Sequence, residues 1–202
     1  MARAEFVTCR AAVKRALSEA LGVSATGISL GRDACPGCGS EEHGPPVVRI
    51  PATTWQFSVT HTAGLGMVAL SPFRVGVDVE RVRPLDADRF DSAVLTRAER
   101  RAVYALPEGG PRALAFLRCW TRKEAVLKAV GIGIATDLTA VDTGPGGLAP
   151  GTGHPVGSAL VDTSPLGFPA LWRAHGVAVP DGWVASLALP AAAGGPHSVR
   201  RL

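Results

Sequence analysis

Two carboxylates alternate with valines in the segment Val75-Gly76-Val77-Asp78-Val79-Glu80. In an extended strand successive side chains point to opposite faces, so Asp78 and Glu80 would share one face, about 7 Å apart at Cα. Two ionised carboxylates at this spacing repel each other unless a cation or a base lies between them. An antiparallel strand with one face in water gives the same alternation. The segment alone leaves a metal-binding and a purely structural interpretation open.

A later segment with helical spacing adds a third carboxylate and two lysines. Glu124 and Lys128 are at positions i and i+4 and share an edge with Trp120, and Lys123 lies beside them. An ordinary solvated Glu–Lys pair would have the same spacing. The glycines of residues 131–133 follow, however, and glycine lets a backbone come close to a ligand. This combination favours a binding site over a plain surface helix.

Asp78, Glu80 and Glu124 together form an all-oxygen set of the kind that suits Mg²⁺, with Mn²⁺ as a possible substitute. Magnesium keeps coordination places for water and substrate phosphates. Lys123 and Lys128 would hold a phosphate alongside. Carboxylate-bound metal next to lysines is the chemistry of pyrophosphate cleavage.

A strand-like segment upstream ends in Thr60 and His61; a histidine there is often structural, although loops at strand ends also carry binding groups. Taken in order, these pieces resemble the motifs of the Sfp-type 4′-phosphopantetheinyl transferases. The matching segments are Phe57-Ser58-Val59-Thr60-His61, Val75-Gly76-Val77-Asp78-Val79-Glu80, Trp120-Thr121-Arg122-Lys123-Glu124-Ala125-Val126-Leu127-Lys128 and Gly131-Ile132-Gly133. Each is weak alone, but their order and spacing are specific, and the resemblance covers residues 9–140.

The resemblance implies an activity and roles for these residues. The family transfers the phosphopantetheine arm of coenzyme A to a serine of an acyl or peptidyl carrier protein and releases adenosine 3′,5′-bisphosphate. By resemblance, Asp78, Glu80 and Glu124 hold Mg²⁺ on the pyrophosphate. Lys123 and Lys128 contact phosphates, and Lys128 also stabilises the charge that develops on transfer. Glu124, or a water that it orients, is the base for the serine proton.

The resemblance also implies residues for the nucleotide end of coenzyme A. Thr60 and His61 would meet the 3′-phosphate. Family members carry a further N-terminal strand and helix with basic residues, and Arg10 and Lys14 are the substitutes that this chain offers. The family often has Gly-Lys-Pro before the histidine strand, where this chain has Gly44-Pro45-Pro46.

The cysteines offer a different interpretation. Cys35 and Cys38 lie in the loop CPGCGSEEH with His43 close behind. A tight Pro-Gly loop with unligated thiols explains this, whereas a zinc site would need a fourth ligand such as Cys9, Cys119 or a histidine. The rival function is a non-catalytic zinc-containing binding module whose basic surface meets nucleic acid.

Composition supports a globular protein with 202 residues, 47% of them hydrophobic, and a net charge of +4. No apolar run reaches the roughly 20 residues that span a bilayer, and the N-terminus lacks the apolar core of a signal peptide. The basic residues are scattered, which argues against nucleic acid. We therefore expect a cytoplasmic monomer without a membrane or nucleic-acid partner, which meets its carrier protein near residues 85–95.

Periodicity predicts the elements that position these residues. Helices are expected at 9–21, 96–104 and 111–130, and strands at 28–30, 55–60, 67–70 and 75–80, with a β-rich remainder. The fold class is α+β. The resemblance implies the 4′-phosphopantetheinyl transferase fold, in which two similar α/β subdomains form a pseudo-dimer. We assign two subdomains, 1–84 and 85–202, with the active site at their interface. Relative to the family, the first is either truncated at its start, without the first strand and helix, or a smaller subdomain.

Overall fold

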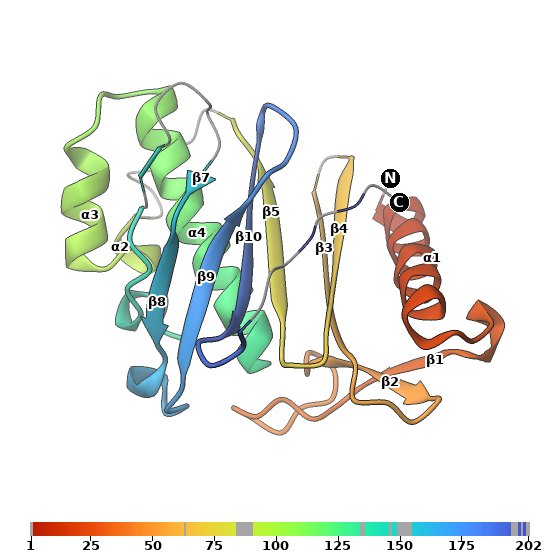
Figure 1. Ribbon diagram of the computed structural model, residues 1–202. Coiled ribbons are helices and arrows are strands. Elements are labelled where there is room, and N and C mark those ends of the chain that lie inside the picture. The colour runs from red at the N-terminus through yellow and green to blue at the C-terminus, as the bar shows by residue number, and fades with distance from the viewer. Residues whose placement is uncertain are drawn as a thin grey trace.

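The structure is a computed structural model that describes residues 2–62, 64–83, 91–133, 136–145, 147–148, 155–194, 198 and 200 (Figure 1). Its helices are α1 (Ala2–Leu21), α2 (Asp91–Val94), α3 (Arg97–Tyr104) and α4 (Gly110–Val130). Its strands are β1 (Ser29–Arg32), β2 (Pro46–Ile50), β3 (Gln56–Thr62), β4 (Leu65–Ser71), β5 (Gly76–Arg81), β6 (Gly147–Leu148), β7 (Pro155–Val156), β8 (Ser158–Asp162), β9 (Leu171–Val177) and β10 (Trp183–Pro190). The α+β class is confirmed.

The first half of the chain places α1 against the antiparallel hairpin of β3 and β4. Val13 and Leu17 are spaced one helical turn apart and are buried with Ile28 and Phe57. The helix ends where predicted, because Gly22 follows it with a positive φ of 67°. It begins earlier than predicted, at Ala2.

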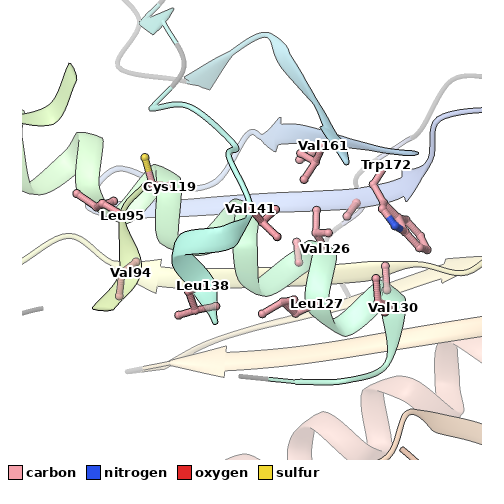
Figure 2. Packing of buried hydrophobic residues seen from close by; sticks show 14 of the residues in the cluster. Val94, Leu95, Cys119, Val126, Leu127, Val130, Leu138, Val141, Val161 and Trp172 are labelled. Atoms are coloured by element: carbon pink, nitrogen blue, oxygen red, sulfur yellow. The ribbon is translucent and has the colours of Figure 1, made fainter. Parts of the chain in front are cut away.

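The second half contributes three strands to a four-stranded antiparallel sheet in the order β5-β10-β9-β8. The long helix α4 packs against β5, β10 and β9 (Figure 1). Figure 2 shows the core between this helix and the sheet, where Val126 and Val130 of α4 lie among residues that include Val161 and Trp172. This core fixes which face of α4 is turned inward.

Strand β5 joins the two halves. It pairs with β10 through six residues, and it also lies beside β3, where the Val77 N–H donates to Ser58 Oγ over 3.1 Å. The proposed division after residue 84 stays a prediction, but β5 carries part of the first range into the sheet of the second.

For β5, the structure excludes one of the two interpretations left open, a strand with its carboxylate face in water. Its carboxylate face does not lie in water, because Asp78 is only 4% exposed and the strand is covered by α4. Gly76 shows how closely the helix approaches: a Cβ there would lie 1.8 Å from the Ala125 carbonyl oxygen. The glycine in this segment is therefore a packing requirement of α4.

Two other local predictions can be compared with the structure. Helix α3, expected at 96–104, begins with a capping box, in which Thr96 and Glu99 exchange side-chain and backbone hydrogen bonds. Of the surface expected at 85–95 to meet the carrier, 85–90 lie outside the described residues, while Val94 and Leu95 are buried. Among the described helices, none has the length and apolarity needed to cross a membrane.

Candidate active site

A pocket of about 410 Å³ opens between β5 and the second half of α4. The side chains that line it are mostly polar and come from three places: β5, α4 with its C-terminal turn, and the loop between β1 and β2. They are Asp78, Glu80, Trp120, Glu124, Lys128, Ile132, Gly133 and His43. The structure thus brings together the three predicted carboxylates and one of the two predicted phosphate-binding lysines.

Asp78 lies at the centre of this arrangement. Its Oδ1 accepts hydrogen bonds from Lys128 Nζ at 2.6 Å and from Thr60 Oγ1 at 3.0 Å. Its Oδ2 is buried and has no hydrogen-bond partner among the described residues. Burial raises the pKa of Asp78, and Lys128 opposes that rise. Thr60 is itself buried, and its hydroxyl group orients the Asp78 carboxylate through this hydrogen bond.

Glu124 lies one helical turn before Lys128 and is 8% exposed. Its Oε1 is also buried without a partner among the described residues. Burial, and then the nearby charge of Asp78, raise the pKa of Glu124 to about 7. The same causes raise the pKa of Glu80, while a hydrogen bond from the Trp120 side chain lowers it. Three carboxylates therefore share the pocket with one lysine.

Buried carboxylate oxygens are normally hydrogen-bonded, so the unsatisfied Asp78 Oδ2 and Glu124 Oε1 require an explanation. A divalent cation coordinated by oxygen would provide one, because it would satisfy both atoms and offset the excess negative charge. By their oxygen chemistry and shared pocket, Asp78, Glu80 and Glu124 would be the donor set for a magnesium ion.

Lys123 was expected to contact phosphate, but it does not line this pocket. It is 1% exposed, forms an ion pair with Glu99 at 2.7 Å, and donates to the carbonyl oxygens of Leu138 and Val141. Neighbouring side chains of a helix point about 100° apart, and here Lys123 points to Glu99 of α3 while Glu124 faces the pocket. In this structure Lys123 lies in the core, and its contact with phosphate stays a prediction.

The residues expected at the nucleotide end are spread more widely. His61 is exposed and lines a second, larger and mostly apolar hollow of about 1030 Å³ beside the β3–β4 hairpin. Strand alternation explains the separation, because Thr60 faces Asp78 and the next side chain points away. Arg10 is exposed and Lys14 is half-buried on α1, and neither lines the carboxylate pocket.

His43 is a pocket residue that sequence reasoning did not assign to this site. It belongs to the cysteine-containing loop, and only the tertiary fold brings that loop beside α4. Ile132 and Gly133 also line the pocket, in agreement with the expectation that the glycine turn lies near a ligand. Gly131 ends α4 in the left-handed conformation, with a φ of 94°.

Comparison with known proteins identifies the family. A sequence model described as the 4′-phosphopantetheinyl transferase superfamily matches residues 74–186, more than half of the chain and the part that holds β5 and α4. The chain belongs to this superfamily. The transferase match includes all three pocket carboxylates and Lys128, and it leaves out Thr60, His61 and His43.

Three relatives carry the same description. The chain is 30% identical over 111 residues to the 4′-phosphopantetheinyl transferase psf-1 of Bacillus pumilus. The matched region covers 50% of this chain and 42% of that protein. It is 32% identical over 99 residues to HetI of Nostoc, a match that covers 47% of this chain and 41% of HetI. It is 36% identical over 105 residues to AcpT of Salmonella typhimurium, a match that covers 50% of this chain and 53% of AcpT. The chain spans about half the length of the curated relatives that it matches.

Proposed function

We propose that this protein transfers the 4′-phosphopantetheine moiety of coenzyme A to a serine of an acyl or peptidyl carrier protein. The observation that carries the proposal is the convergence of Asp78, Glu80 and Glu124 beside Lys128, with two buried carboxylate oxygens unsatisfied. Membership of the transferase superfamily supports the same reaction. Membership of this superfamily also disfavours the alternative function, a non-catalytic zinc-containing binding module.

In the proposed reaction the serine oxygen attacks the phosphorus that bears the pantetheine arm. The bond from that phosphorus to the bridging oxygen breaks, and adenosine 3′,5′-bisphosphate leaves. Asp78, Glu80 and Glu124 would hold Mg²⁺, which when bound neutralises charge on the pyrophosphate. All three carboxylates line one pocket, which supports this assignment.

Lys128 supplies a positive charge at the edge of the carboxylate group. Its ammonium is held by Asp78 Oδ1 and by the Val77 carbonyl oxygen at 3.3 Å, so it has a defined place near the site of transfer. We propose that it contacts a phosphate oxygen and stabilises the charge that develops there. Glu124 accepts the serine proton, directly or through a water.

Thr60 and His61 remain proposals for different tasks. Thr60 orients Asp78 through its hydroxyl group. His61, exposed on the other side of β3, would meet the nucleotide end of coenzyme A, with Arg10 and Lys14 of α1 as further basic groups. Carriers of fatty-acid, polyketide and nonribosomal-peptide synthesis are the substrates to test, and we propose a cytoplasmic monomer as the working form.

The proposal is tested by mass spectrometry of apo carrier proteins incubated with coenzyme A, Mg²⁺ and this chain. We expect the carrier to gain the mass of phosphopantetheine, and Asp78→Ala or Glu124→Ala to abolish the gain while the fold is retained. Glu19→Gln is a matched control, because this glutamate is exposed on α1 and pairs only with Arg15 in the described structure. Failure on carriers of all three pathways would refute the activity, and coenzyme A binding without transfer would identify a non-catalytic member.

A further inference from the structure

The loop between β1 and β2 gathers three groups that bind soft metals. The ligand atoms of Cys35, Cys38 and His43 all lie within 4.8 Å of one another. Cys38 Sγ and His43 Nε2 are 3.1 Å apart. Tetrahedral zinc with Zn–S of about 2.3 Å and Zn–N of about 2.0 Å separates such atoms by roughly 3.5 Å, so small changes in side-chain torsions would admit the ion.

The backbone of this loop is already shaped to hold a thiolate. The N–H groups of Cys38 and Gly37 hydrogen-bond to the Cys35 sulfur. The Gly39 N–H donates to the Cys35 carbonyl oxygen at 2.8 Å, and Gly39 has a φ of 77°, a conformation that favours glycine. Outer hydrogen bonds of this kind orient metal ligands and stabilise their charge.

Further hydrogen bonds hold the loop segments on either side of His43. The Cys35 N–H donates to the Ser40 carbonyl oxygen at 2.8 Å. The Arg32 guanidinium of β1 donates to the Gly44 carbonyl oxygen, also at 2.8 Å. Because these bonds fix both ends of the loop, the three candidate ligands are brought together by the backbone and not by chance contact of mobile side chains.

We infer that Cys35, Cys38 and His43 bind a zinc ion through two thiolates and one imidazole nitrogen, with a water molecule as the fourth ligand. Binding releases the two thiol protons. Sulfur and imidazole ligands select zinc over magnesium, so this site and the carboxylate pocket would hold different ions. Cys119 of α4 is buried in the core between this helix and the sheet, and Cys9 of α1 lies against Gly66 of β4. Neither cysteine belongs to the cluster of Cys35, Cys38 and His43.

The inferred zinc site would stabilise one wall of the candidate active site. His43 lines both the cluster and the carboxylate pocket. Gly37 packs near Ile132, since a Cβ on Gly37 would lie 3.5 Å from Ile132 Cγ2, and Ile132 also lines the pocket. A metal in the loop would therefore keep this wall in place against the end of α4, whether or not the chain transfers phosphopantetheine.

Metal analysis of protein purified under reducing conditions without chelator tests the inference directly. We expect one zinc per chain, and replacement by Co²⁺ should produce sulfur-to-cobalt charge-transfer absorption. Cys38→Ser and His43→Ala should weaken binding by at least roughly tenfold, the lower bound seen for loss of an outer-shell partner. Cys9→Ser is the matched control and should keep its zinc.

Several outcomes would overturn the zinc site. These are wild-type protein without zinc and without cobalt absorption, zinc retained by both ligand variants, equal zinc loss in Cys9→Ser, or a Cys35–Cys38 disulfide in the reduced preparation. None depends on transferase activity, so a failure here is distinct from a failure of the proposed function.

Limited proteolysis supplies a second readout that does not depend on the variants. Glu41 and Glu42 are exposed in the loop between the ligands. Removing zinc with phenanthroline, a soft-metal chelator, should accelerate cleavage at these positions by a glutamate-specific protease, while cleavage at the exposed Glu19 stays unchanged. Equal cleavage at Glu41 and Glu42 with and without chelator would contradict the inferred role of the metal in ordering the loop.

Discussion

At the scale of single residues, the pocket combines features that lower stability with features that suit catalysis. Asp78 and Glu124 each bury a carboxylate oxygen without a partner in the described structure. Buried, unsatisfied charge costs free energy, and such groups are concentrated at functional sites. Lys123 shows the opposite case, because its charge is fully paired in the core.

Glu124→Gln should stabilise the metal-free protein. A carboxyl group whose pKa is raised on folding costs stability once it ionises, and this cost is complete above the folded pKa, here about 7. We expect the free energy of unfolding to rise by roughly 1–3 kcal/mol at about pH 8 and by much less at about pH 5. Denaturant titrations at both pH values measure it, and an equal gain at both would contradict the burial of an ionised Glu124.

Lys123→Met should destabilise the fold, because it leaves the buried Glu99 carboxylate without its ion-pair partner. The expected loss is about 3–5 kcal/mol, and adding Glu99→Gln should recover part of it. In protein that remains folded, KM for coenzyme A should not change. Normal stability combined with a raised KM would restore the phosphate-binding role that the family resemblance implies.

At the scale of elements, the site depends on how closely α4 lies on β5. Gly76 permits the contact, and Asp78 and Glu80 face α4 from the same side of the strand. The lengths of both elements follow from periodicity, and α4 ends at Gly131 as expected. The sequence does not show which face of α4 is turned to the strand, because the core between α4 and the sheet decides it.

Gly76→Ala should separate β5 from α4, because the new Cβ would lie 1.8 Å from the Ala125 carbonyl oxygen. We expect a loss of at least about 1–3 kcal/mol in the free energy of unfolding, typical of overpacking. Gly27→Ala is the control, since nothing lies within 4 Å of a Cβ there. Equal effects of the two substitutions in urea denaturation would show that the close approach is absent in solution.

At the scale of the whole molecule, the sequence predicts the helices and strands better than the tertiary contacts between them. The segments that hold Asp78 and Glu124 were identified from spacing and resemblance, and the fold brings them together. The position of His43 beside them could not be predicted, because it depends on the path of the β1–β2 loop across the end of α4. The burial of Lys123 depends likewise on Glu99, a residue of another helix.

The site also connects the two halves of the chain, which gives a prediction for the whole molecule. Thr60 of β3 bonds to Asp78 of β5, and Asp78 bonds to Lys128 of α4, so these elements share one hydrogen-bonded chain. Coenzyme A with Mg²⁺ should therefore increase protection from hydrogen exchange in β3 and α4 together, because a ligand that binds only the folded site stabilises every element that forms it. The exposed β8 edge of the sheet serves as the internal control and should change little. Protection confined to α4 would show that the hairpin of β3 and β4 is not coupled to the site.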